Sequence, residues 1–174
     1  MPQIPQKLVD YAVYIAGTNN LLGTGEITLP TFEAMTTEVN GGGVAGGLEV
    51  PTPGQFGSQT VTIAFNTINK DVISMMRSKQ VALEFMAAQQ SWDSAQSQII
   101  NEGLKIAFRG LAKNLELGTL TKNDSTGTSL ELEMTYIKIF LSGTAVLELD
   151  KLNYIYRING ADEMADIRKF LGMA

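Results

Sequence analysis

The sequence contains no cysteine and no histidine among its 174 residues. Without cysteine the chain can form no disulfide, thiolate metal site or cysteine nucleophile. Histidine is the usual general base and a common metal ligand near neutral pH, so its absence excludes a Ser-His-Asp triad and an H-E-x-x-H zinc site. Any catalysis would have to depend on carboxylate, lysine or tyrosine side chains.

The sequence also lacks a long apolar run. Its densest apolar stretch, YIKIFL at 136–141, has the length of a strand and not the roughly 20 residues of a membrane-spanning helix. The N-terminal MPQIPQKLVDY has no basic segment followed by an apolar run, so we expect no secretory signal and synthesis in the cytoplasm. The net charge is −5 and the basic residues are scattered, which predicts no tight binding of nucleic acid.

Glycine is concentrated in one stretch. VNGGGVAGGLEVPTPGQFG, at 39–57, holds seven of the 17 glycines and includes the phosphate-binding pattern G-x-G-x-x-G. A dinucleotide site needs a helix directly after the glycines. Here Pro51 and Pro53 follow, and proline removes backbone donors and holds the chain extended or turned. The Lys and Ser or Thr of a P-loop are also missing, so we predict no nucleotide cofactor.

Apolar and polar residues alternate over most of the chain, which predicts strands with one buried face. Val61, Ile63 and Phe65 share one face, and the segments 81–85 and 104–108 repeat the pattern. Between 129 and 141 the apolar set changes from even to odd positions, which indicates a bulge or burial on both faces. A partner strand at 145–158 shows a similar shift. Together they predict a long curved hairpin around a turn at 142–144, as in a barrel or a bent sandwich.

Two segments have helical patterns. At 69–78 Asn69 is the expected N-cap, and the short helix is expected to close one end of the sandwich. At 161–171 we expect Asn159 as the cap and Gly172 as the terminator. One face of this second helix is expected to be buried through Met164, Ile167, Phe170 and Leu171. The polar segment NDSTGTS at 123–129 is interpreted as a turn between strands.

The C-terminal segment LELDKLNYIYRINGADEMADIRKFLGM, at 147–173, resembles the end of the major tail tube proteins of contractile-tailed phages and phage tail-like bacteriocins. These proteins end in an acidic-Asp-x-x-Asn strand, an Arg-x-Asn-Gly turn and a short helix that finishes in Leu-Gly. A weaker match is ITLPTFE at 27–33, followed by a strand, a glycine-rich loop and a strand at 58–66. The matching C-terminal positions are Glu148, Asp150, Asn153, Arg157, Asn159, Gly160, Asp162, Arg168, Leu171 and Gly172.

The resemblance implies a fold and a role. It implies one tail tube domain over 1–174, mainly β, with a β-sandwich or barrel-like fold, a short internal helix, a C-terminal helix and a glycine-rich extended loop at 40–57. Such subunits self-assemble as stacked hexameric rings around a central channel inside a contractile sheath. The implied partners are the chain itself, the sheath, tape measure, baseplate and tail terminator proteins; DNA passes through without specific binding, and no membrane is involved. The expected location is a virion tail or tail-like particle, and no catalytic residue, cofactor or metal is implied.

Two sets of residues are candidates for assembly. Glu131 and Glu133 share one strand face, as do Glu148 and Asp150, and these acids are candidates for the channel lining; a plain solvated face and glycosidase-type carboxylates are the alternatives. The glycine-rich loop is expected to be mobile in the free subunit and to become ordered against the next ring. Its candidate contact residues are Asn40, Gly41, Gly42, Gly43, Gly46, Gly47, Leu48, Val50, Pro51, Pro53 and Phe56.

Two other functions remain open at this point. The same architecture would suit the secreted tube protein of a type VI secretion system. From a different class, a small carboxylate-dependent hydrolase would use the paired acids for chemistry. Assembly into rings or tubes separates a tube protein from a hydrolase.

Overall fold

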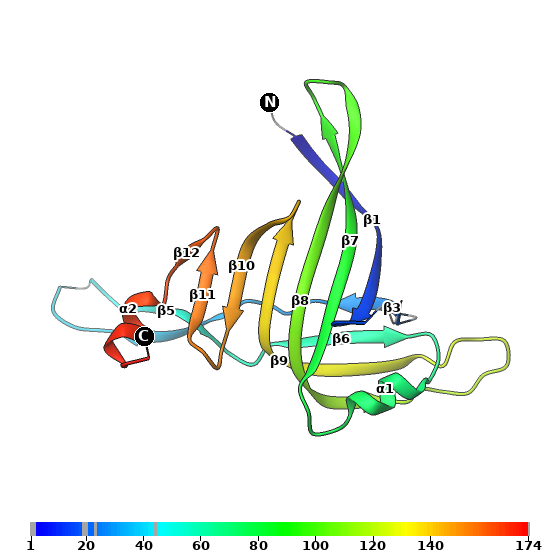
Figure 1. Ribbon diagram of the computed structural model, residues 1–174. Coiled ribbons are helices and arrows are strands. Elements are labelled where there is room, and N and C mark those ends of the chain that lie inside the picture. The colour runs from blue at the N-terminus through cyan, green and yellow to red at the C-terminus, as the bar shows by residue number, and fades with distance from the viewer. Residues whose placement is uncertain (1–2, 19–20, 23, 44, 174) are drawn as a thin grey trace.

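The computed structural model describes residues 3–18, 21–22, 24–43 and 45–173. The fold is mainly β, as predicted: one large antiparallel sheet, a separate two-stranded hairpin and two short helices (Figure 1). The strands are β1 (Gln3–Ile15), β2 (Leu21–Leu22), β3 (Thr24–Thr28), β4 (Ala34–Val39), β5 (Leu48–Phe56), β6 (Thr60–Phe65), β7 (Val81–Asp93), β8 (Gln98–Glu116), β9 (Thr128–Leu141), β10 (Thr144–Asp150), β11 (Ile155–Ile158) and β12 (Ala161–Asp162). The helices are α1 (Lys70–Met75) and α2 (Ala165–Phe170).

The strand pairings form a circuit. The sheet runs in the order β12-β11-β10-β9-β8-β7-β1-β2, and β6 pairs with both β9 and β3. Because β2 and β3 are neighbouring segments of chain, the pairings lead from β1 through β2 and β3 to β6, β9, β8, β7 and back to β1. This circuit encloses a barrel-like core, and β10, β11 and β12 extend the sheet away from it.

A bulge in β9 explains the change of phase between 129 and 141. Arg109 lies opposite Tyr136, whereas the next residue of β8, Gly110, lies opposite Met134. Thr135 is therefore an extra residue in β9, and side chains beyond it change faces. Before the bulge β9 pairs with β6, and after it with β10. The bulge thus marks the point where the sheet extension leaves the barrel.

The phase shift expected inside a single strand at 145–158 has a different cause, and the expectation of one strand there is wrong. β10 ends at Asp150, and β11 begins at Ile155. The Asp150 carboxylate accepts hydrogen bonds from the backbone N–H groups of Leu152 and Asn153, both at 3.0 Å. A side chain that bonds the following backbone in this way stabilises a turn at the expense of a strand ladder.

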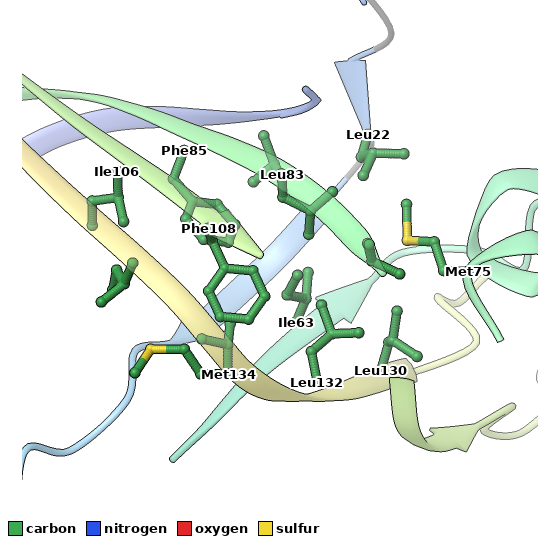
Figure 2. Close-up of a cluster of buried hydrophobic side chains, with 14 of the residues drawn as sticks. Leu22, Ile63, Met75, Leu83, Phe85, Ile106, Phe108, Leu130, Leu132 and Met134 are labelled. Carbon is green, nitrogen blue, oxygen red and sulfur yellow. The ribbon is translucent and has the colours of Figure 1, made fainter. Parts of the chain in front are cut away.

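Apolar residues from β1, β6, β7, β8 and β9 fill the barrel (Figure 2). The predicted inward face of β6 is confirmed, since Val61, Ile63 and Phe65 are almost fully buried. Helix α1 begins as predicted: the Asn69 side chain accepts a hydrogen bond of 2.8 Å from the backbone N–H of Val72. Val72 and Met75 are buried in the same core cluster, so α1 closes one end of the barrel.

The start of the second helix differs from the expectation. Asn159 is not its cap but lies with Gly160 in a turn of positive φ (47° and 86°) that joins β11 to β12. Asn-Gly is the preferred pair for such hairpin turns. Helix α2 begins four residues later than expected and ends as predicted at Gly172 (φ 70°), where the Met173 N–H donates to the Arg168 carbonyl at 2.9 Å.

Two hairpins project from the barrel (Figure 1). The outer part of the β7–β8 hairpin, joined by the first residues of β1, rises as a three-stranded arm. The β4–β5 hairpin runs to the side that carries α2. Within the described part of the chain, neither helix has the length or apolar character to cross a bilayer.

Candidate assembly surfaces

The face of the sheet that points away from the core carries the four candidate acids. Glu131 and Glu133 alternate with the buried residues Leu130 and Leu132 of β9. Leu149, which is 1% exposed, separates Glu148 from Asp150 on β10 in the same way. All four acids therefore lie on one polar face, on the side opposite the barrel core.

Two acids of this polar face bind neighbouring strands and loops. The Glu131 carboxylate lies 3.2 Å from the ammonium group of Lys113. The Glu133 carboxylate accepts hydrogen bonds from the Ser58 hydroxyl at 2.7 Å and from the Gln59 backbone N–H at 3.3 Å. Glu133 thus attaches the residues before β6 to β9.

Glu148 is the most strongly paired of the four acids. Its carboxylate lies 3.2 Å from Arg157 and 3.4 Å from Lys138, and its side chain is 13% exposed. The Tyr136 hydroxyl donates a hydrogen bond to the same carboxylate at 3.2 Å. Burial and the negative charge of Glu148 both raise the pKa of Tyr136, so its hydroxyl remains a donor at neutral pH. The guanidinium of Arg109 stacks over the Tyr136 ring, 4.9 Å from its centre.

The C-terminal motif is a second network of charges. The Asp162 carboxylate lies 2.6 Å from Nη2 of Arg168 and 3.4 Å from Nε of Arg157, and it accepts a hydrogen bond from the Met164 N–H. The hydrogen bond from Arg168 is the main cause that lowers the pKa of Asp162 to about 2. Arg168 also donates to the Tyr154 carbonyl at 2.7 Å. These contacts fix α2 against β11 and β12.

The glycine-rich stretch is a hairpin in the structure. The described residues of its tip are 40–43 and 45–47, and Leu48–Phe56 form β5, so the loop expected over 40–57 is shorter than predicted. Gly41, Gly43 and Gly46 have φ values of 148°, 98° and 109°, a region that other residues rarely adopt. The apolar residues beside the tip face solvent: Leu48 is 54% exposed and Val50 40%.

The root of this hairpin packs inside its own subunit. Phe56 makes edge-to-face contacts with Phe32 at 5.5 Å and Tyr156 at 5.2 Å between ring centres. Gly54 has a φ of 71°, and a Cβ atom there would lie 2.5 Å from the sulfur of Met164. Phe56 therefore anchors the hairpin to its own subunit, whereas the sequence suggested a contact with a neighbour. Pro51 and Pro53 are exposed on the outer part of β5.

Sequence reasoning missed the three-stranded arm. β1 pairs with β7 as far as Gln3 and Asp93, and the arm exposes Ile4 (53%), Leu8 (48%) and Ile99 (57%). The sequence did contain a signal for β1 itself, because every second residue from Tyr11 through Val13 to Ile15 is apolar and packs in or against the core. Nothing in the local sequence shows that β7 and β8 continue beyond the barrel.

No group of three or more acidic, histidine or cysteine side chains in the described ranges is arranged to hold a metal ion. The acids instead bind neighbouring cations and backbone groups, and projecting hairpins expose apolar residues. These features are typical of a structural subunit that assembles with other copies.

Comparison with known proteins identifies which kind of subunit this is. The family model described as phage tail tube protein FII matches residues 5–172, and the chain belongs to this family. It is 23% identical over 163 residues to the major tail tube protein of Serratia phage KSP20, covering 94% of this chain and 93% of that protein. It is 20% identical over 174 residues to the tail tube protein of Escherichia phage P2, covering 98% and 99%.

The chain is therefore a structural component of the phage tail and not an enzyme. The carboxylate-dependent hydrolase considered from the sequence is wrong. As a tail tube protein it assembles with itself and with other tail components.

Proposed function

We propose that this chain forms hexameric rings that stack into a tube around a central channel, inside a contractile sheath. The observation that supports this most directly is the polar face across β8, β9, β10 and β11, which lies opposite the core. In a ring of such subunits this face turns inward and forms the channel wall, while the barrel core lies behind it.

The channel wall in this arrangement includes Glu131, Glu133, Glu148 and Asp150. Their paired cations, Lys113, Lys138 and Arg157, are spread among the acids and do not form a basic cluster. Tight binding of DNA requires clustered cations that replace counterions on the phosphates. A wall of interleaved charges lets DNA pass without specific binding.

The tip of the β4–β5 hairpin contacts the next ring in this proposal. The tip extends from the barrel, it is rich in glycine, and Leu48 and Val50 beside it expose apolar side chains. Glycine allows the backbone to approach a neighbouring surface closely. Pro51 and Pro53 stiffen the strand that leads back to the subunit.

The remaining partners in this proposal are the sheath, tape measure, baseplate and tail terminator proteins. Co-expression with the sheath and tape measure proteins tests these partners, because the tube should then copurify inside its sheath and with the tape measure protein in its channel.

The direct test is electron microscopy of the purified chain. We expect tubes or rings with sixfold symmetry and a central channel. A sample that stays monomeric at concentrations where other tail tube proteins assemble, or forms rings of another symmetry, would contradict the proposal. In a reconstruction at least one of the pairs Glu131/Glu133 and Glu148/Asp150 must border the channel; if all four acids face the sheath or a subunit contact, the assigned orientation of the sheet is wrong.

A further inference from the structure

The barrel has one closed and one open end. Helix α1 closes the first end with Val72 and Met75. At the opposite end the apolar core continues into a groove of about 280 Å³. Figure 2 shows the two ends of the core, with Met75 at one and Phe85 and Ile106 at the other. The groove is lined by residues of β1, β3, β7 and β8, among them Glu26, Phe85 and Ile106, and by Leu29.

An apolar ring fits this groove. An engineered apolar cavity of about 150 Å³ accommodates benzene, and this groove is larger and open to solvent on one side. Its rim carries one acidic residue, Glu26, which is exposed. The occupant that suits the groove therefore has an apolar side chain next to a cation.

Helix α2 presents such a group on the other side of the molecule (Figure 1). Phe170 is 85% exposed and Leu171 56% exposed, although the sequence predicted that both would be buried. Lys169, beside Phe170, is exposed as well. The ion pair between Arg168 and Asp162 at 2.6 Å and the closing bond from Met173 to the Arg168 carbonyl hold this helix in place.

We propose that Phe170 of one subunit occupies the open barrel end of the adjacent subunit in the same ring, with Lys169 paired to Glu26 of that neighbour. The proposal rests on the ring assembly proposed above, since the occupant is a second copy of this chain. It explains why the C-terminal motif, whose charges fix α2, is attached to a helix with an exposed aromatic side chain.

The positions of the two surfaces favour a ring. α2 follows β12 at one end of the strand order, while the groove is lined by β8, β7 and β1, towards the other end of that order, and by β3. A contact between two different surfaces of the same chain is head-to-tail, and such contacts close into rings when the rotation permits. A twofold dimer would instead need each surface to meet its own copy.

Because the chain contains no cysteine, a disulfide can test this contact without background thiols. We would combine Leu171→Cys, which is 56% exposed and leaves Phe170 and Lys169 in place, with Leu29→Cys, a groove residue that is 47% exposed. Under oxidation we expect a ladder of covalent oligomers that ends at six subunits. The matched control combines Leu29→Cys with Leu120→Cys, which is 90% exposed but lies outside α2, and it should give no ladder. An equal ladder from both pairs, or none from the first, would overturn the proposal.

Charge reversal supplies an independent test. Glu26→Lys and Lys169→Glu should each reduce the fraction of assembled protein at low ionic strength, and the double variant should restore it. Phe170→Ala should remove assembly while circular dichroism and thermal melting of the monomer stay unchanged. Normal rings from Phe170→Ala would refute this contact and leave the tube function intact. Absence of rings from the unaltered chain would instead refute the tube function.

Discussion

Asp162 and Arg168 form the shortest ion pair among the described residues, 2.6 Å between Oδ2 and Nη2, and both side chains are 19% exposed. Asp162 lies in β12 and Arg168 in the last turn of α2. The pair therefore determines where the helix lies on the sheet. Two further charged positions of the C-terminal motif, Glu148 and Arg157, continue the same network into β10 and β11.

The first prediction is a pH dependence of stability that depends on Asp162. Its pKa in the folded protein is about 2, mainly because of the hydrogen bond from Arg168, whereas an aspartate in an unfolded chain has a pKa of about 3.9. A carboxylate with a lowered pKa stabilises the fold above the unfolded value, and this contribution is lost as the pH falls towards 2. The unfolding free energy of the unaltered chain should therefore exceed that of Asp162→Asn at pH 6, and the difference should shrink between about pH 4 and pH 2.

Chemical denaturation of both proteins over this range measures the difference. Asp166→Asn is a suitable control, because Asp166 is an exposed acid in the first turn of α2. A difference between the unaltered chain and Asp162→Asn that stays constant from pH 6 to pH 2 would show that Asp162 does not act through its charge.

The second prediction concerns Gly54. A Cβ atom at this position would lie 2.5 Å from the Met164 sulfur, and its φ of 71° is strained for other residues. Gly54→Ala should reduce the free energy of unfolding by about 2 kcal/mol or more. Gly57→Ala is the matched control, since a Cβ there has open space and no positive φ. Equal stability of the two variants in urea denaturation would contradict the packing of β5 against Met164.

The third prediction concerns the bulge at Thr135. Deleting this residue moves every later side chain of β9 to the other face, which would place Tyr136 and Lys138 inward and Ile137 outward. We expect insoluble protein or loss of the cooperative thermal transition. Thr135→Ala keeps the extra residue and removes the methyl group and the hydroxyl, which donates to the Arg109 carbonyl at 3.1 Å and accepts from Gln80 at 3.0 Å, so it should fold with a loss of about 1 kcal/mol. A deletion variant as stable as Thr135→Ala would show that β9 can change register.

These residues also show how much of the fold could be predicted from sequence. Alternation identified the inward residues of β6, β7, β8 and β9, because one buried face imposes a period of two. The shift at Thr135 was visible for the same reason. The turn after Asp150 was not, because it depends on a side chain that bonds the backbone two and three residues further along. The spacing of apolar residues does not reveal hydrogen bonds between a side chain and the backbone.

The assembly surfaces were less predictable. The sequence placed all four acids on strand faces, and the structure puts them on one polar face. It did not reveal that Phe56 packs against Tyr156 of its own subunit, since that contact joins residues 100 positions apart. Phe170 shows the opposite error: it was expected to be buried and is 85% exposed, because helical periodicity indicates which residues share a face and not whether that face is covered.

The last prediction concerns the tip of the β4–β5 hairpin. Shortening the segment from Gly41 to Gly47 should leave the barrel intact, because the tip is exposed and the hairpin is anchored at its root by Phe56 and Gly54. Thermal melting of the subunit should therefore change little. If the tip contacts the next ring, the shortened protein should still form single rings and fail to stack into tubes, which electron microscopy distinguishes directly.

Hydrogen exchange separates this role from that of a plain hairpin tip. Ordering a glycine-rich segment has a high entropic cost, so the backbone N–H groups of the tip should exchange fast in isolated subunits. In assembled tubes they should be protected, while the N–H groups of β6 and β9 in the barrel should be protected in both states. Normal tubes from the shortened chain, or equally fast exchange of the tip in subunits and tubes, would show that the stacking contact lies elsewhere. The next surface to test would then be the three-stranded arm, which exposes Ile4 and Ile99.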